Sequence, residues 1–451
     1  MKNQLAIFGG KPIHSTRFEE RVLIGKEEKE RALRVLDSQL LSGFIGGPGK
    51  FFNGGPEINK LESEWNKTFG NAFSISTNSW TTGLQTILQS LNLDAGDEII
   101  VPPYTMSACP SAIILNGCIP VFADIDPHRL SLDPSSIEEN ITSRTKAIMV
   151  VHLLGCPAEM DKICEIANKH NLFVIEDGAQ SPGAVFKGKN VCTIGDIGGF
   201  SFNFHKHIHC GEGGLITTNN QKLAEKCMLI RNHGENLTDQ LEEEILNNSF
   251  GTNYRLTELQ AAVVIPQIKN IENIVSIRNN NADYLKKRLS DIPGLEVQSI
   301  ESDSVHSHYM MPIFFKERIL EIQRNVFLRA VNAELPTPTT WDTNPLAEGY
   351  VKPLYINKLY QGKIGSGRDN FPFNLTKRDY HQGLCPVTEN LYERELLLTP
   401  LIHEFTSEAS LKAFADAIEK VHENIEDLKS LKPDNGVSDP LTIINNNESI
   451  K

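Results

Sequence analysis

One lysine stands among three histidines in the stretch FSFNFHKHIHCGEGG, which ends in a glycine-rich turn. The histidines are His205, His207 and His209. In an extended strand they would share one face, and Lys206 would point to the other. Three imidazoles can bind a metal, but no nearby Asp, Glu or Cys pattern completes a ligand set. The stretch therefore predicts a lysine site without a metal, with His205 and His207 lining the pocket and His209 packing near the turn.

Lysine chemistry follows from the surroundings of Lys206. An amine among weakly solvated neighbours loses its proton more easily and becomes a nucleophile that can form a Schiff base with an aldehyde. The glycines after Lys206 would let the chain turn at the end of a buried element.

A carboxylate follows the apolar run LFVI, in LFVIEDGAQ. Asp177 lies where this strand would leave the sheet, and two interpretations are open. It could cap the next helix. Alternatively, it could hold a protonated heterocyclic nitrogen, since a buried carboxylate needs a cationic partner to stay ionised.

A helix N-terminus rich in hydroxyl and amide groups precedes these two motifs in the chain. In TNSWTTGLQTILQSLNL, apolar residues at helical spacing follow Thr77–Thr82. Such an end can bind phosphate, although plain N-capping is equally compatible with it. A phosphate site, a strand-end carboxylate and a buried lysine are together what pyridoxal phosphate requires for its phosphate, pyridine nitrogen and aldehyde.

Alternating strands and helices are predicted to position these groups. Between residues 56 and 265, the runs DEIIV, CIPVF, KAIMVV and LFVIED read as strands buried on both faces, with helical patterns between them. This pattern predicts a doubly wound α/β domain with a mostly parallel sheet, whose ligands gather at the carboxyl ends of the strands.

The chain divides into four predicted parts. Residues 1–24 are expected to form an N-terminal extension, residues 25–280 the large α/β domain, residues 281–430 a smaller C-terminal α+β domain, and residues 431–451 a disordered tail. A long helix near residues 272–292 would lead into the small domain, and an apolar stripe from Phe414 to Leu428 would form its closing helix. The Pro-, Gly- and aromatic-rich segment 341–375 is expected to be irregular and to shape a pocket.

Composition excludes several function classes. The net charge of −13, without long single-sign blocks, argues against binding nucleic acid or an anionic membrane. The start of the chain has no apolar run typical of a signal peptide, and the eight cysteines include no C-x-x-C pair. We therefore expect a cytoplasmic enzyme with reduced cysteines.

Several long motifs resemble those of the DegT/DnrJ/EryC1/StrS family of sugar aminotransferases. The strongest is VIEDGAQSPGAVFKGKNVCTIGDIGGFSFNFHKHIHCGEGGLITTNN, joined by GGPEINKLESEW, DEIIVPPYTMSA, GTNYRLTELQAA and CPVTENLYERELLLTP in the family's order. The resemblance spans residues 25–428. It implies a pyridoxal-phosphate enzyme of fold type I, the aspartate aminotransferase architecture, working as a homodimer.

The resemblance also implies roles for individual residues. Lys206 matches the lysine that forms the Schiff base and moves protons, and Asp177 the carboxylate paired with the pyridine nitrogen. Gln180 matches a residue beside the ring hydroxyl, and Ser201 a phosphate ligand. Asn253 matches an asparagine that reaches the phosphate in the partner subunit, which would make the active sites shared.

Two positions depart from the family pattern. The phosphate loop, usually a short Asn/Ser-Gly-Thr turn, reads TNSWTT with an extra residue, and Ser79, Trp80 and Thr81 are assigned to it. At Met106 the family commonly has an aromatic ring that stacks on the cofactor. Methionine can cover a ring face through its polarizable sulfur, so cofactor binding is still expected.

The resemblance implies transamination from glutamate or glutamine to a keto-sugar, expected to be nucleotide-linked, or to a keto-cyclitol. A branch of the family has histidine at the position of Lys206 and is a pyridoxamine-dependent keto-sugar 3-dehydrase. Because His207 resembles that branch's second histidine, this alternative stays open, as does a non-catalytic regulatory relative.

Overall fold

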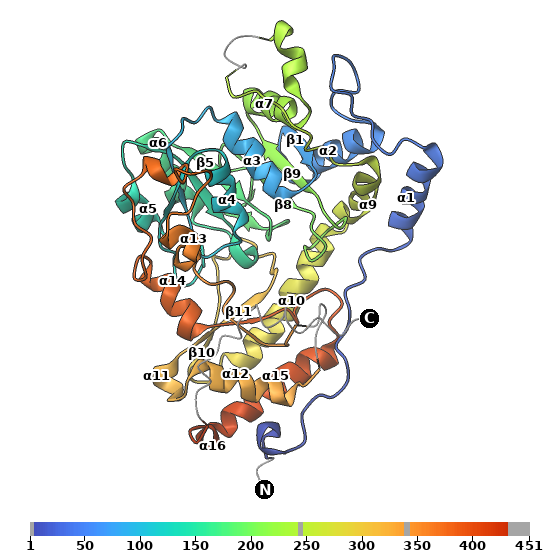
Figure 1. The fold of residues 1–451 in the computed structure, drawn as a ribbon. Coiled ribbons are helices and arrows are strands. Elements are labelled where there is room, and N and C mark those ends of the chain that lie inside the picture. Colours follow the sequence, from blue (N-terminus) through green and yellow to red (C-terminus); the bar gives the residue numbers. More distant parts are fainter. Residues whose placement is uncertain (1–3, 242–246, 338–342, 432–451) are drawn as a thin grey trace.

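A seven-stranded sheet and a four-stranded sheet organise the chain (Figure 1). The computed structural model describes residues 4–241, 247–337 and 343–431. In the larger sheet the strand order is β1-β9-β8-β5-β4-β2-β3. These strands are β1 (Phe73–Thr77), β2 (Glu98–Val101), β3 (Ile119–Phe122), β4 (Thr145–Val151), β5 (Phe173–Asp177), β8 (Ile197–Ser201) and β9 (Gly214–Thr218).

Most of the larger sheet is parallel. Strand β9 alone among these seven runs against its neighbours, pairing antiparallel with both β1 and β8. Strands β2, β3, β8 and β9 are buried at every residue, as expected for strands covered on both faces. The predicted doubly wound sheet is confirmed.

Helices cover both faces of this sheet, because neighbouring strand residues point to opposite sides. Ile99 belongs to a core with α3, α4 and α7, whereas Ile100 belongs to a core with α6. Near β8 and β9, this second face is covered by α2 and α9. The helices are α2 (Pro56–Phe69), α3 (Trp80–Ser90), α4 (Ala108–Leu115), α6 (Met160–His170), α7 (Gln221–Arg231) and α9 (Glu258–Ile268).

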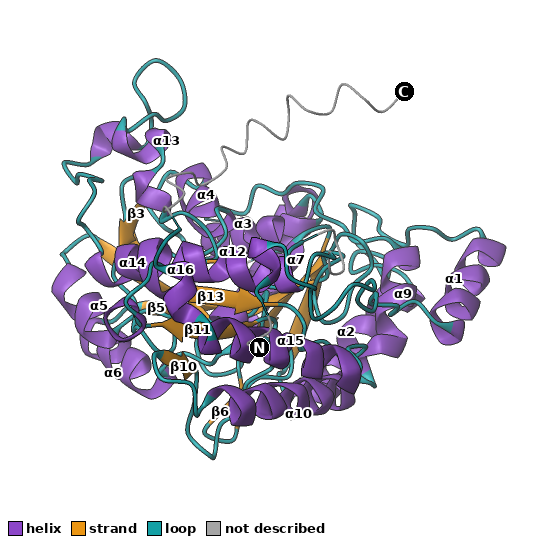
Figure 2. Ribbon diagram, turned by 90° about the horizontal axis from the view of Figure 1, so that it is seen from below, coloured by secondary structure: helices purple, strands orange, loops and turns teal. Residues whose placement is uncertain are grey.

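The smaller sheet follows the long helix α10 (Ile271–Leu289), close to the predicted 272–292. It is antiparallel with the order β10-β11-β13-β12. Its strands are β10 (Leu295–Val297), β11 (Met311–Phe315), β12 (Ala347–Glu348) and β13 (Leu396–Thr399). Helices α12 (Arg324–Glu334), α15 (Glu408–Glu423) and α16 (Ile425–Leu428) pack on it (Figure 2). The predicted closing helix is thus two helices that meet at Asn424, and its apolar stripe is buried as expected, apart from the half-buried Ile425.

The N-terminal segment joins the two parts of the molecule. Leu5 and Phe18 are buried in the core of the smaller sheet. From there the segment runs along the side of the molecule to α1 (Lys26–Ser38), which packs on α9 (Figure 1). Residues 4–25 are therefore integrated into the fold.

Between Phe200 and Gly214 the chain is mostly a loop, and it is not one continuous strand. Strand β8 ends at Ser201 and β9 begins at Gly214, so residues 202–213 form the connection between two antiparallel strands. The alternation of histidines with other residues therefore does not define two faces of a strand, and the conditional expectation above is corrected.

The remaining described α-helices and strands are short. They are α5 (Pro134–Asn140), the hairpin of β6 (Val185–Phe186) and β7 (Lys189–Asn190), α11 (Glu317–Leu320), α13 (Lys358–Gln361) and α14 (Pro386–Asn390). Within residues 343–375 the chain is mostly irregular, as predicted. The predicted tail, apart from residue 431, lies outside the described residues. Among the described helices, none is long and apolar enough to cross a membrane.

Candidate active site

The predicted chemical groups meet at the carboxyl edge of the larger sheet. Asp177 ends β5, Ser201 ends β8 and Thr77 ends β1. Thr77 and Ser201 both pair with Gly214 of β9, so the ends of β1 and β8 lie at the same level. This is the edge at which doubly wound sheets bind ligands.

Asp177 is buried and held by three donors. The indole Nε1–H of Trp80 donates to Oδ1 over 2.8 Å, and the backbone N–H of Ala179 donates to the same oxygen over 2.9 Å. The thiol of Cys109 donates to Oδ2 over 3.0 Å. These bonds fix the rotamer of the carboxylate, and Asp177 is the N-cap of no helix among the described residues.

Lys206 lies on the loop after β8 and is buried, with 8% of its surface exposed. Burial lowers its pKa to about 8, although Asp177 and Cys109 act in the opposite direction. Its Nζ lies 4.9 Å from the ring centroid of Tyr309. The amine therefore faces an apolar ring and feels the Asp177 carboxylate, and it is neutral in an appreciable fraction of molecules near neutral pH.

The predicted phosphate loop forms the N-terminus of α3. Ser79 is the N-cap residue, and its Oγ accepts a hydrogen bond from the backbone N–H of Thr82. The backbone N–H groups of Trp80 and Thr81 lie in the first turn, where a helix provides no acceptor of its own. Ser201 lies on the other side of Gly214, whose ideal Cβ would approach the Trp80 nitrogen to 2.7 Å.

The Trp80 side chain has a different position from the one its assignment to the phosphate loop suggests. Its ring packs between Gly83 and Gly199, where an added Cβ would approach ring atoms to 2.8 and 2.5 Å respectively. The indole N–H is used on Asp177. The backbone N–H of Trp80 therefore lies at the helix end, whereas its side chain binds the carboxylate of Asp177.

Gln180 lies beside these groups with both ends of its amide engaged. Its Oε1 accepts from the backbone N–H of Leu154 over 2.7 Å, and its Nε2 donates to the Tyr350 hydroxyl over 2.6 Å. Tyr350 comes from the irregular segment after residue 343, which therefore contributes to this pocket.

Two predicted residues are exposed in the single chain. Met106, in the loop before α4, is 58% exposed. Asn253 is exposed next to Tyr254, whose backbone carbonyl accepts the N–H of Asn78 at the start of the phosphate loop. Neither residue is brought into contact with Lys206 by an interaction within the described chain.

The three histidines occupy different environments. His205 lies near Tyr309, with 6.1 Å between ring centroids. Burial, and to a smaller extent the charge of Lys206, lowers the pKa of His205 to about 4. His207 is fully buried with Nε2 2.8 Å from the carbonyl of Ser307. The backbone N–H and carbonyl of His209 bond to the side chain of Gln267 of α9, two residues before the glycine-rich turn begins. The three rings do not form a ligand cluster.

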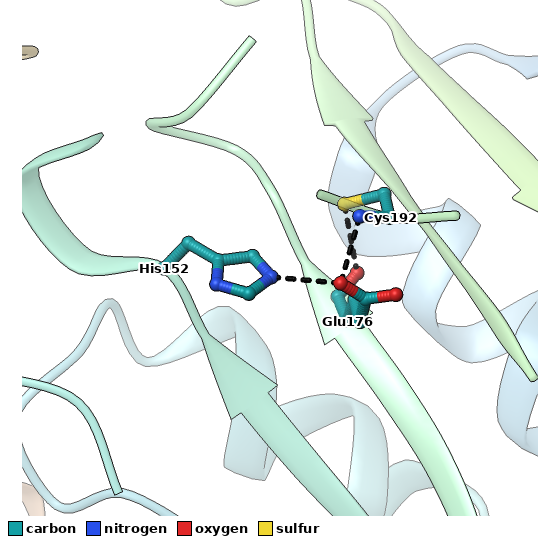
Figure 3. Close-up of side chains that lie close together, drawn as sticks. All are labelled: His152, Glu176 and Cys192. Atoms are coloured by element: carbon teal, nitrogen blue, oxygen red, sulfur yellow. Dashed lines mark hydrogen bonds and ion pairs between the residues drawn. The ribbon is translucent and has the colours of Figure 1, made fainter. Parts of the chain in front are cut away.

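A different group of side chains has the composition of a metal site. His152, Glu176 and Cys192 lie together and are buried (Figure 3). The Ala158 N–H donates to His152 Nδ1, which leaves Nε2 to donate to Glu176 over 3.0 Å. Glu176 also accepts backbone N–H bonds from residues 192, 194 and 195. Burial raises the pKa of Cys192 well above that of a free thiol. Because His152 and Glu176 are bound by these donors and acceptors, the group is a satisfied hydrogen-bond network beside Asp177.

Sequence reasoning missed four residues of this region. Cys109, Tyr309 and Tyr350 contact the predicted groups directly, and Arg21 binds the loop that carries Lys206. No local pattern marks them, because each reaches the site from a distant part of the chain.

A family model matches residues 45–418, most of the chain. The chain belongs to the DegT/DnrJ/EryC1/StrS aminotransferase family. It is a pyridoxal-phosphate-dependent aminotransferase with fold type I architecture, as the sequence predicted.

Two named relatives and one crystal structure are similar to this chain over much of its length. GDP-perosamine synthase of Escherichia coli O157:H7 is 35% identical, covering 64% of this chain and 75% of the relative. The dTDP-3-amino-3,6-dideoxy-α-D-galactopyranose transaminase of Aneurinibacillus thermoaerophilus is 36% identical, covering 65% and 76%. The crystal structure of an aminotransferase from Psychrobacter cryohalolentis is 30% identical with a TM-score of 0.78, covering 91% of this chain and all of the other.

The residues of the site suit pyridoxal phosphate. A helix N-terminus and Ser201 offer donors for a phosphate around Gly214, whose missing side chain leaves the approach open. Asp177 offers a fixed carboxylate for a protonated ring nitrogen, and Lys206 offers an amine with a lowered pKa for the aldehyde. The three requirements that the sequence suggested are thus met by groups on one edge of the sheet.

Proposed function

We propose that this protein transfers the amino group of glutamate or glutamine to a nucleotide-linked keto-sugar, with a keto-cyclitol as the alternative acceptor. The observation that carries the proposal is the buried amine of Lys206 beside Asp177, with its pKa lowered to about 8. The two named relatives, whose names refer to GDP- and dTDP-linked amino sugars, support the choice of acceptor.

Lys206 is proposed to hold the cofactor and then to move protons. Its neutral amine would hold the cofactor's aldehyde and, when free of it, could take a proton from the donor's α-carbon and hold that proton for the transfer. The same amine, acting in reverse, serves the keto acceptor. When bound, pyridoxal phosphate supplies a ring that stabilises negative charge at the reacting carbon.

The other residues are proposed to hold and orient the ring. Asp177 keeps the ring nitrogen protonated, while Trp80 and Cys109 fix the carboxylate. Gln180, held by Leu154, would lie beside the ring hydroxyl. For the phosphate we propose the backbone N–H groups of Trp80 and Thr81 with the hydroxyls of Ser79 and Ser201.

Met106 and Asn253 complete the proposed site. Met106 would cover one face of the ring through its sulfur. Asn253, exposed in the single chain, is proposed to reach the phosphate in the second subunit of a homodimer. The site would then be shared between subunits, as the resemblance implied.

The absorption spectrum of the purified protein, before and after adding the donor, tests this proposal. We expect the band of the lysine-bound cofactor to convert to the band of its amino form with glutamate or glutamine. A Lys206→Ala variant should stay folded and fail to complete turnover. Full activity of that variant would overturn the assignment of Lys206.

The acceptor half-reaction requires a second measurement. Protein carrying the amino form of the cofactor is mixed with GDP- and dTDP-linked 3-keto- and 4-keto-6-deoxy sugars, and the amino sugar is identified by mass spectrometry. One amine formed per cofactor reoxidised is expected. Loss of a sugar hydroxyl without amine formation would instead establish the dehydrase reaction.

A further inference from the structure

Arg21 of the N-terminal segment binds the loop that carries Lys206. The guanidinium of Arg21 donates to three consecutive backbone carbonyls. Nη1 reaches His205 O over 3.2 Å, and Nη2 reaches Lys206 O over 3.2 Å and His207 O over 3.3 Å. We propose that Arg21 is a positioning residue that fixes the backbone of Lys206 and thereby the direction of its amine. This inference rests on the function proposed for Lys206.

The backbone of this loop needs such a donor. Residues 202–213 belong to neither sheet, so the carbonyls around Lys206 have no strand partner. Buried carbonyls require hydrogen bonds, and the planar fork of an arginine can serve several at once. A lysine ammonium is a compact charge and cannot reproduce this geometry.

Arg21 is itself held in a buried ionic cluster. Its Nε and Nη2 donate to Glu404 Oε1 over 3.2 and 3.0 Å. Arg278 of α10 donates to the other carboxylate oxygen over 2.8 Å. Only 5% of the side chain of Arg21, 5% of that of Glu404 and 2% of that of Arg278 is exposed. Burial by itself would raise the pKa of Glu404, but the two arginines outweigh it and lower the pKa to about 2.

The same cluster holds the other wall of the pocket. Arg278 Nη1 donates to His308 O over 2.7 Å and to Tyr309 O over 3.3 Å. Tyr309 provides the ring that Lys206 faces. One carboxylate, Glu404, therefore orients two guanidinium groups, of which one fixes the lysine and the other fixes the aromatic ring opposite it.

The arrangement gives the N-terminal segment a part in the chemistry. The segment is anchored in the smaller sheet's core by Leu5 and Phe18, and Arg21 extends from it to a loop of the larger sheet. Loss of the Arg21 contacts would release the carbonyls on both sides of Lys206 and let its amine turn away from the position proposed for the cofactor aldehyde.

The test uses the capture of pyridoxal phosphate by the full-length protein stripped of cofactor. Borohydride fixes the captured cofactor on its lysine, and peptide mass spectrometry locates that lysine and gives the rate. Wild-type protein must be labelled at Lys206; labelling elsewhere would overturn the function proposed for Lys206 and not the role of Arg21. The variants are Arg21→Lys and Arg21→Met, with circular dichroism of the bound cofactor as a second readout.

We expect both variants to capture the cofactor at Lys206 at least ten-fold more slowly and to give an altered cofactor dichroism. Arg21→Lys should be less affected than Arg21→Met, because an ammonium can still bind one or two carbonyls. Glu404→Gln provides an independent variant, since it leaves Arg21 in place with a weaker partner, and it should slow capture less.

The matched control is Lys420→Met. Lys420 Nζ anchors the same N-terminal segment by binding Glu334 over 2.8 Å and Lys11 O over 3.1 Å, but it does not contact the Lys206 loop. It should lower the melting temperature and leave capture and dichroism unchanged. Folded Arg21 variants with the wild-type rate and dichroism would overturn the inference. Equal slowing by Lys420→Met at a similar melting temperature would also overturn it.

Discussion

In the role proposed for it, Lys206 reacts only as a neutral amine, so its reactivity should follow its own titration. At pH values below its pKa of about 8, the amine is mainly in the ammonium form, which has no free electron pair for the aldehyde. We expect the rate of cofactor capture to rise with pH up to about 8 and then to level off. An exposed lysine would still be gaining reactivity at pH 10.

The measurement is the borohydride-trapped fraction at Lys206 against pH, with an exposed lysine of the same protein as the internal reference. The reference lysine should follow the ordinary titration. A Lys206 profile that coincides with the reference would contradict the effect of burial described here.

Trp80 shows how one side chain can carry a function that its sequence position conceals. Its position in the phosphate loop suggests a phosphate contact, yet its indole N–H binds Asp177. Trp80→Phe keeps most of the ring and removes this donor. A hydrogen bond to a charged group contributes about 1.5–3 kcal/mol, so we expect the dissociation constant of pyridoxal phosphate to increase about ten-fold or more.

Titration of the cofactor-free protein with pyridoxal phosphate gives this constant. Cys109→Ala is the companion variant, and it should weaken binding less because a thiol is a weak donor. An unchanged dissociation constant in Trp80→Phe would mean that the hydrogen bond from the indole to Asp177 does not contribute to cofactor binding.

Among the elements, the contact of β8 with α3 leaves no room for a side chain at Gly199. An added Cβ at Gly199 would lie 2.0 Å from Leu215 O and 2.5 Å from the Trp80 ring. We expect Gly199→Ala to reduce the free energy of unfolding by about 1–3 kcal/mol, as overpacked sites do, and to weaken cofactor binding by displacing Trp80.

Thermal unfolding and cofactor titration measure the two effects. Gly47→Ala is the control, because a Cβ there meets nothing within 4 Å. If Gly199→Ala matched this control in both measurements, the strand would have to move freely relative to α3.

The elements were the most predictable part of the molecule. In runs such as EIIV and IPVF every residue except Glu98 is apolar, which indicates buried parallel strands without any tertiary information. The segment from Phe200 onward misleads because its alternating residues suit a strand, but β8 ends at Ser201 and the chain leaves the sheet. Periodicity cannot show where pairing with a neighbour stops.

The residues of the site could be predicted from the sequence only where a short motif contains them. Lys206, Asp177 and the helix end at Ser79 follow from short patterns at strand ends. Arg21 is 185 residues from Lys206 in sequence and Tyr350 is 170 residues from Gln180, so nothing local indicates either contact.

For the whole molecule, the proposed homodimer makes a prediction about hybrids. If the site takes Lys206 from one subunit and Asn253 from the other, a dimer of one Lys206→Ala chain and one Asn253→Ala chain keeps one intact site. We expect each parent variant to be impaired and the hybrid to recover about half of the wild-type activity per dimer.

Two different affinity tags allow the hybrid to be isolated after co-expression. A hybrid no more active than the mean of its parents would place Asn253 in the site of its own chain or outside any site. Recovery would require the subunits to share their residues.

The Arg21–Glu404 contact joins residues 383 positions apart in the chain. During synthesis, Lys206 leaves the ribosome well before Glu404 does, so the charged partner of Arg21 is absent while the larger sheet can already form. A nascent or prematurely terminated chain would therefore contain Lys206 without the Glu404 carboxylate that orients Arg21. Fast capture of the cofactor is therefore expected only after Glu404 has been synthesised.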